Sequence, residues 1–238
     1  MLRRFLSAIK EAVTTVGESD PRPDTYLAKL FHKPRYDEVT AIIKELAGDA
    51  IDVLVDVGGG RGALYEWLMR AGTNVGFYLC CDVDGGRLRE ASSEKVLCDA
   101  HHLPFRSRSI DVAVCSEVLE HLKQPLRALN NILEVSKRFV IVTFPDERVK
   151  NALGFRYPEH ISEPRFEDVM KLAKAKGYAL MLRKRLYYAF PPSIIDRAVA
   201  FSPIGVKFFS ATLAVLSRLL KELCLIKTEI ILLKKMED

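Results

Sequence analysis

Short apolar runs alternate with longer amphipathic stretches along most of the chain. The runs predict seven strands, at Val53–Val57, Val75–Cys81, Lys95–Cys98, Ile110–Cys115, Arg138–Thr143, Tyr178–Tyr188 and Thr228–Leu233. Helical spacing predicts helices at Asp37–Leu46, Arg87–Ser92, Pro125–Val135 and Glu163–Lys176, and another between the first strand and Gly72. This alternation predicts an α/β fold, with a doubly wound and mostly parallel sheet covered by helices on both faces. Ligands of such sheets bind at the carboxyl ends of the strands.

Two stretches fall outside this alternation. Residues 2–16 have the spacing of an amphipathic helix, and 17–36 mix proline, glycine and charge like an arm. Residues 206–226 are apolar at helical spacing, with a narrow cationic stripe. The predicted organisation is therefore an N-terminal helix and arm (1–36), a core (37–190), an apolar helical insertion (191–227) and the last strand of the core (228–238).

Composition narrows the class of protein. Hydrophobic residues make up 49% and charged residues 28%, which excludes global disorder, and the net charge of +5 is modest. Basic residues are not interleaved with aromatic ones in a stripe, so we expect no nucleic-acid partner. The five cysteines lie in apolar runs and form no CxxC, at Cys80, Cys81, Cys98, Cys115 and Cys224. We therefore expect reduced thiols, no metal site and a cytoplasmic protein.

A glycine turn follows the first predicted strand and opens a helix. It reads Gly58-Gly59-Gly60-Arg61-Gly62. Glycines here allow positive φ and close approach of a ligand, and the following helix start presents free N–H groups. The turn also satisfies the dinucleotide pattern GxGxxA, and Asp82, about 20 residues further on, fits a ribose in either cofactor class.

Three further features separate the two cofactor classes. Asp56 precedes the glycines, where a carboxylate would face a cationic ligand and repel a pyrophosphate. Asp99 follows the third strand within CDAHHLPF, and the fourth strand leads into SEVLEHL at 116–122. The order of these blocks resembles class I S-adenosylmethionine-dependent methyltransferases, nearest to the small-molecule branch that includes ubiquinone-biosynthesis-type enzymes. The resemblance covers roughly Glu38 to Lys176 and favours this cofactor over a nicotinamide.

The resemblance implies a donor site and a Rossmann-like seven-stranded sheet whose last strand is antiparallel. The implied cofactor-binding residues are Asp56, Gly58, Gly60 and Gly62 for the methionine part, Asp82 for the ribose, Val83, Asp99, Ala100 and the His101 backbone for the adenine, and Ser116 near the sulfonium. Arg61 replaces the small hydroxyl residue of the family pattern. Its side chain either reaches the cofactor carboxylate or points to solvent.

The acceptor side is less specified, because methyl transfer needs mainly alignment and a place for a proton. The candidate catalytic residues are Glu117 after the fourth strand, and Tyr157 and His160 in the loop after the fifth. Glu117 could instead be a helix-start carboxylate, and the two loop residues could be plain surface. His121 is a further candidate base, with a structural role as the alternative.

The prediction is thus an S-adenosylmethionine-dependent methyltransferase acting on a small or lipid-like acceptor. The alternatives are a non-catalytic adenosylmethionine-binding protein and an NAD-dependent oxidoreductase. Segment 206–226 serves as a lid, a homodimer seam or a helix lying on a membrane surface, or else packs inside the protein. The expected location is cytoplasmic, with peripheral contact to the inner membrane face as an option.

Overall fold

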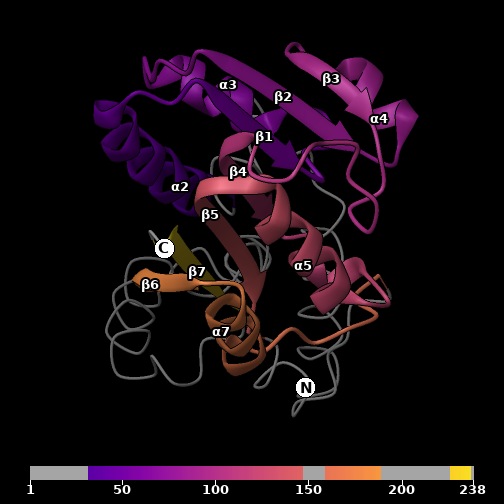
Figure 1. The fold of residues 1–238 in the computed structure, drawn as a ribbon. Helices are drawn as coiled ribbons and strands as arrows, with labels where there is room; N and C mark the ends of the chain where they lie inside the picture. The colour runs from indigo at the N-terminus through magenta and orange to yellow at the C-terminus, as the bar shows by residue number, and fades with distance from the viewer. Residues whose placement is uncertain (1–31, 147–158, 189–225, 237–238) are drawn as a thin grey trace, which may run out of the picture.

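Seven strands form one sheet in the computed structural model, which describes residues 32–146, 159–188 and 226–236 (Figure 1). The strands are β1 (Val53–Val57), β2 (Phe77–Asp82), β3 (Glu94–Leu97), β4 (Ile110–Ser116), β5 (Ser136–Pro145), β6 (Tyr178–Tyr188) and β7 (Ile226–Lys235). Their order is β3-β2-β1-β4-β5-β7-β6. β7 is antiparallel to both of its neighbours, and the other pairings are parallel. The predicted fold class is confirmed.

Helices cover both faces of the sheet. α2 (Lys33–Leu46) and α3 (Ala63–Arg70) pack on one face, where Ile43 and Leu64 join the same buried cluster. α5 (Pro125–Val135) and α7 (Phe166–Ala175) pack on the other, where Leu129 and Val169 are fully buried. The sheet is therefore buried on both sides, which explains why its central strands are continuous apolar runs without polar alternation.

α2 begins at Lys33, earlier than the apolar spacing alone indicates. Proline near its first turn is compatible with a helix start, because the missing N–H would have no partner within the helix. The added turn contains Arg35 and Tyr36, and both residues are buried. Tyr36 stacks on Trp67 of α3, with ring centroids 5.8 Å apart. This turn thus belongs to the packed layer of helices.

The register of the parallel strands brings their carboxyl ends to one edge. Val57 pairs with Cys81 of β2 and with Cys115 of β4, and Asp82 pairs with Leu97 of β3. The segments that follow β1, β2, β3 and β4 therefore emerge side by side. This is the edge at which ligands of doubly wound sheets bind.

The cysteines differ in part from the expectation of reduced thiols. Cys80 and Cys115 are free and buried, as expected. Cys81 and Cys98 are joined by a disulfide, with Cα atoms 5.9 Å apart, so the expectation is wrong for this pair. The reason is the pairing of β2 with β3. The Cys98 N–H donates to the Asp82 carbonyl, and this places the sulfur atoms of Cys81 and Cys98 on neighbouring segments of the sheet.

Several predictions concern residues outside the described ranges. These are the N-terminal helix and arm up to residue 31, the insertion from 191 to 225, and Tyr157. Within the ranges that are described, no helix is long and apolar enough to cross a membrane.

Candidate functional site

The glycine turn connects β1 to α3 and is bonded to the neighbouring strand. The N–H groups of Gly58 and Gly59 both donate to the Cys81 carbonyl, at 2.7 and 3.1 Å. Gly58, Gly60 and Gly62 have φ of +77°, +54° and +75°, values that side-chain-bearing residues rarely adopt. Gly62 is also the N-cap of α3. The turn thus presents backbone rather than side chains at the carboxyl end of β1, as the predicted methionine-binding role requires.

Gly58 also brings the turn against the segment that follows β4. A methyl group at Gly58 would lie 2.3 Å from Val118 Cγ2, closer than any packed atoms approach. Val118 comes directly after Glu117. The donor turn and the candidate catalytic segment are therefore in contact through this one glycine.

Asp82 lies at the end of β2 and organises the turn from the side. Its Oδ2 accepts the Gly60 N–H at 2.8 Å, and its Oδ1 accepts the Asp84 N–H at 2.8 Å. A carboxylate has about four acceptor positions, so both oxygens can still accept ribose hydroxyls. The predicted ribose role fits this geometry and stays a prediction.

Asp56 is buried beneath the turn rather than open toward a ligand. It is 3% exposed, and its Oδ2 accepts the Tyr78 hydroxyl at 2.7 Å. Burial raises the pKa of Asp56 to about 6, against the lowering effect of the Tyr78 hydrogen bond. Asp56 would therefore act on a cationic ligand by electrostatic attraction across the glycine turn and not by direct contact.

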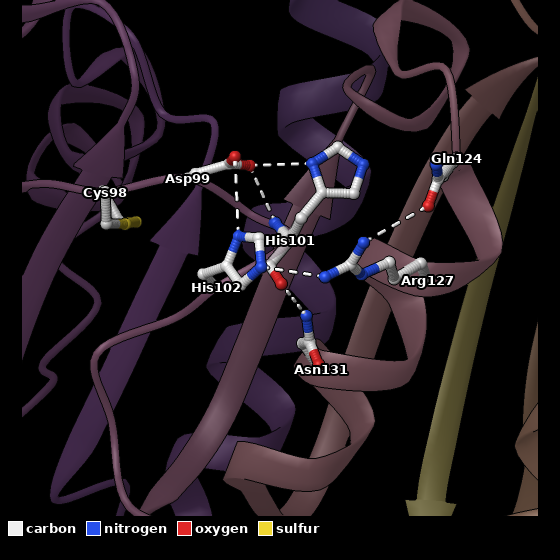
Figure 2. A network of polar contacts seen from close by, with 8 residues as sticks. Cys98, Asp99, His101, His102, Gln124, Arg127 and Asn131 are labelled. Carbon is white, nitrogen blue, oxygen red and sulfur yellow. Dashed lines mark hydrogen bonds and ion pairs between the residues drawn. A yellow bond between two sulfur atoms is a disulfide. The ribbon is translucent and has the colours of Figure 1, made fainter.

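Asp99 is the centre of a polar network on the loop after β3 (Figure 2). Its Oδ1 accepts the His101 N–H at 2.8 Å and lies 2.8 Å from His101 Nδ1, while Oδ2 lies 3.8 Å from His102 Nδ1. The hydrogen bond from the His101 backbone is the main cause that lowers the pKa of Asp99. From α5, Arg127 Nη2 lies 2.8 Å from His102 Nε2, and Asn131 donates to the His101 carbonyl (Figure 2).

This network orders the loop that the resemblance assigns to adenine. Ala100 is half-buried, and Val83, after β2, is 73% exposed. An exposed apolar side chain of this kind is available to lie against a planar ring. The adenine-binding roles of Val83, Asp99 and Ala100 remain predictions.

A second polar group gathers at the end of β4. The Thr143 hydroxyl donates to Glu117 Oε1 at 3.1 Å and lies 3.0 Å from Ser116 Oγ. Arg35 of α2 reaches Glu117 Oε2 with Nη1 at 3.4 Å. Glu117 itself has φ of +55°, a strained conformation for a residue with a side chain. Strained residues cluster at functional sites, which agrees with the predicted catalytic role without proving it.

His121 and His160 are brought together, as neither position in the sequence indicates. Their rings meet edge to face with centroids 4.8 Å apart. His121 Nδ1 lies 3.0 Å from the Glu159 carbonyl, and loss of hydration is the main cause that lowers the pKa of His121. With Glu120, the two histidines form a group of three possible metal ligands. These three residues are thus a candidate metal site, which the sequence did not predict.

Arg61 forms an ion pair that the sequence did not predict. Its Nε lies 3.1 Å from Glu90 Oε1 at the end of α4 (Gly85–Glu90). The side chain is 35% exposed and clamps the turn to the next helix. Contact of Arg61 with the cofactor carboxylate stays a prediction, and the partial exposure of its side chain agrees with the solvent-facing alternative.

Four residues of the site were missed in the sequence. Arg35, Tyr78, Thr143 and Glu120 each contact a predicted site residue or ligand group. Only Glu120 carried a local signal, as part of SEVLEHL. Tyr78 and Thr143 come from strands whose sequences look like ordinary core, and Arg35 comes from the stretch that was predicted to be an arm.

Comparison with known proteins now adds to this geometry. A family model described as a methyltransferase domain matches residues 55–142, the part that holds the glycine turn, Asp82, Asp99 and Glu117. Residues 55–142 thus match a methyltransferase domain. The predicted class, enzyme type and cofactor, S-adenosylmethionine, are confirmed at the level of this domain, because S-adenosylmethionine is the methyl donor of the class.

Individual proteins with a similar sequence or structure agree with this match. The demethylmenaquinone methyltransferase of Paenarthrobacter aurescens is 30% identical over 148 residues, 52% of this chain and 57% of that protein, so the chain aligns with only about half of that relative. Magnesium protoporphyrin IX methyltransferase from Synechocystis, with bound SAH, has a TM-score of 0.63 at 13% identity, covering 95% of this chain and 94% of that one. A [4+2]-cyclase has a TM-score of 0.61 at 18% identity, covering 97% and 94%. At these identities the structures show the fold alone.

Proposed function

We propose that the chain transfers a methyl group from S-adenosylmethionine to a small or lipid-like acceptor. The observation that carries this proposal is the contact between Gly58 and Val118. Because of it, the donor turn and the segment with Ser116 and Glu117 adjoin at one edge of the sheet. A donor and an acceptor bound on the two sides would be held next to each other, which is most of what an in-line displacement requires.

The residues present fit the donor. The positive-φ glycines leave a backbone cradle that side chains would fill, and Asp82 fixes Gly60 while keeping acceptor positions for a diol. When bound, S-adenosylmethionine supplies a methyl group already activated on a sulfonium. Glu117 and Ser116, joined through Thr143, would orient the acceptor, and Glu117 would take its proton.

One experiment tests the proposal against its alternatives. The protein is incubated with cell extract and methyl-labelled S-adenosylmethionine, and mass spectrometry looks for a labelled product. Calorimetry measures the affinity for the donor in parallel. Labelled product that depends on the protein supports methyl transfer. Tight donor binding with no labelled product supports the non-catalytic alternative, and the cyclase neighbour shows that the fold also occurs outside methyl transfer.

The NAD-dependent alternative has its own test. Asp56 beneath the turn and the Asp99 network both suit an adenosyl sulfonium rather than a pyrophosphate. NADH at millimolar concentration should therefore leave the donor affinity unchanged. Competitive displacement of S-adenosylmethionine by NADH would instead favour the oxidoreductase.

A lipid-like acceptor is the finer part of the proposal. It is supported by the name of the demethylmenaquinone methyltransferase, although that similarity covers 57% of that protein. It also draws on the cationic apolar segment 206–226, which lies outside the described residues. We propose a cytoplasmic protein whose segment touches an anionic bilayer, with homodimer formation as the competing use.

Liposomes distinguish these two uses. The wild-type chain should sediment with anionic liposomes at low salt and less at high salt, because exposed charges are screened. Replacing Phe208 and Phe209 with serine should abolish sedimentation and leave donor affinity intact, whereas replacing Ser210 with alanine should change neither. Protein that stays in the supernatant at low salt contradicts the membrane contact.

A further inference from the structure

Three possible metal ligands converge beside the end of β4. Glu120 and His121 belong to the short turn η3 (Leu119–His121), and His160 comes from the segment before α7. Their ligand atoms all lie within 4.8 Å of one another. No second group of three such residues exists in the described part of the chain.

The backbone holds these side chains in place. The N–H groups of Ile161 and Ser162 both donate to the Glu120 carbonyl, at 2.9 and 3.0 Å. The Ser162 hydroxyl donates to the Leu119 carbonyl at 2.9 Å. Three hydrogen bonds thus fasten the His160 segment onto η3, so the ligand set does not depend on a mobile surface histidine.

The orientation of His121 suits a ligand. Its Nδ1 lies 3.0 Å from the Glu159 carbonyl, which can only accept, so Nδ1 carries the proton and Nε2 keeps its lone pair. A metal-bound histidine commonly donates its other N–H to a carbonyl in this way. Glu120 is 1% exposed, which places its carboxylate inside the protein beside the two histidines.

We propose that Glu120, His121 and His160 bind one divalent first-row transition metal ion, of the Mn²⁺ to Zn²⁺ series. Two imidazoles and one carboxylate favour these ions over Mg²⁺ and Ca²⁺, which prefer oxygen ligands. Three protein ligands also leave coordination positions open, as in catalytic rather than structural sites.

The second half of the inference rests on the proposed function. Glu117, on the same short segment, is the candidate base, so an ion held by the three ligands would lie near it, and an open position on that ion would be within reach of the acceptor. A hydroxyl oxygen of the acceptor bound there would have a lowered pKa. Its O–H bond would break, with the proton passing to the Glu117 carboxylate and the electron pair staying on the oxygen. This assigns the acceptor to the class of hydroxyl compounds.

Metal binding is measured without donor or acceptor. The full-length protein is stripped with EDTA and titrated with Co²⁺, whose visible absorption reports its ligands, and with Zn²⁺ by calorimetry. We expect one ion per chain. His160→Ala and Glu120→Gln should each weaken binding at least 100-fold, while His102→Ala, which removes an exposed histidine of the Asp99 network, should leave it unchanged.

Circular dichroism and the melting temperature check that each variant is folded, and His160→Ala alone suffices if Glu120→Gln does not fold. The proposal is overturned if the stripped wild type binds no ion, or if folded His160→Ala binds like His102→Ala. Unchanged labelled product in EDTA, with the ion shown to be absent, overturns the catalytic half. Bound ion and bound donor without any product overturn the proposed function instead, and leave the metal site standing.

Discussion

The donor side and the acceptor side of the site differ in the kind of contact that holds them together. On the donor side, most contacts involve the backbone. The N–H groups of the glycine turn donate to the Cys81 carbonyl and to Asp82, and Asp99 accepts the His101 N–H. On the acceptor side, side chains contact side chains, as in the links from Arg35 and Thr143 to Glu117. The donor side is therefore a property of local turns. The acceptor side depends on how distant elements pack, and chemistry there is carried by titratable groups.

The largest expected effect lies on the acceptor side. If Glu117 accepts the proton of the acceptor, Glu117→Gln should lower kcat about 10²–10⁴-fold, the range for removing a general base. Donor affinity should change little, because the amide keeps the shape of the side chain and its contact with Thr143. The rate is measured with the acceptor identified from labelled extract, and donor affinity by calorimetry.

Glu134→Gln, at an exposed glutamate of α5, is the matched control and should keep the wild-type rate. A Glu117→Gln rate within a few-fold of wild type would assign Glu117 to the positioning of Arg35 alone. The acceptor side would then have lost its base, and the contrast with the donor side would weaken.

Gly58→Ala should damage both sides at once. An alanine there must adopt φ near +77° and place its methyl group 2.3 Å from Val118 Cγ2. Positive φ costs about 1–2 kcal/mol and overpacking about 1–3 kcal/mol, so the free energy of unfolding should fall by about 2–5 kcal/mol. Urea denaturation measures the change.

The double variant Gly58→Ala with Val118→Ala separates the two causes. Removing the valine methyls should recover the overpacking part and leave the backbone part. No recovery would mean that Val118 does not press on the turn, and that the two sides of the site are not coupled through this glycine.

The same contrast explains what the sequence predicts well. All seven strands were predicted, because buried strands are apolar runs bounded by turns. The antiparallel direction of β7 was implied by the family resemblance and not by the pattern. The spacing of the glycines and Asp82 within one βαβ unit predicted a tight turn beside a carboxylate, and the structure shows positive φ at the glycines and a Gly60 N–H bonded to Asp82. Local pattern and structure coincide in these regions.

The remaining features required contacts between residues far apart in the chain. Three contacts join segments whose sequences give no sign that they will meet. They are the Arg35–Glu117 ion pair, the Cys81–Cys98 disulfide and the ring contact between His121 and His160. Arg61 shows the same limit, because its partner Glu90 lies on the next helix of the fold. No periodicity encodes such pairs.

A smaller effect is expected for Asp82→Ala on the donor side. Loss of hydrogen bonds to a charged acceptor should weaken S-adenosylmethionine binding by about 1.5–3 kcal/mol. Part of this loss comes through Gly60, whose N–H would lose its acceptor at 2.8 Å. Calorimetry on the folded variant gives the affinity.

Asp84→Asn is the control for Asp82→Ala. Asp84 accepts the N–H groups of Gly86 and Arg87 at the start of α4, and asparagine keeps this cap while removing one nearby charge. Its donor affinity should match wild type. Equal losses in both variants would point to general charge near the turn, and unchanged affinity in Asp82→Ala would remove Asp82 from the site.

The smallest expected effect concerns Asp56, a donor-side carboxylate whose pKa is raised. Its pKa is about 6 in the folded protein, raised mainly by burial, against an ordinary value of 3.8. Because the folded pKa is raised, the protonated form is the one that folding favours. The contribution is complete below about pH 4 and is lost as pH rises through 6.

Relative to Asp56→Asn, which stays neutral, wild-type protein without ligand should therefore lose about 1–1.5 kcal/mol of unfolding free energy between pH 5 and pH 8. Urea denaturation of both proteins at the two pH values measures this difference, and other titrating groups cancel in the comparison. A difference that does not change with pH would show that Asp56 titrates normally. The glycine turn would then lie over a carboxylate that stays fully ionised, and the donor side would hold a fixed negative charge beneath the turn.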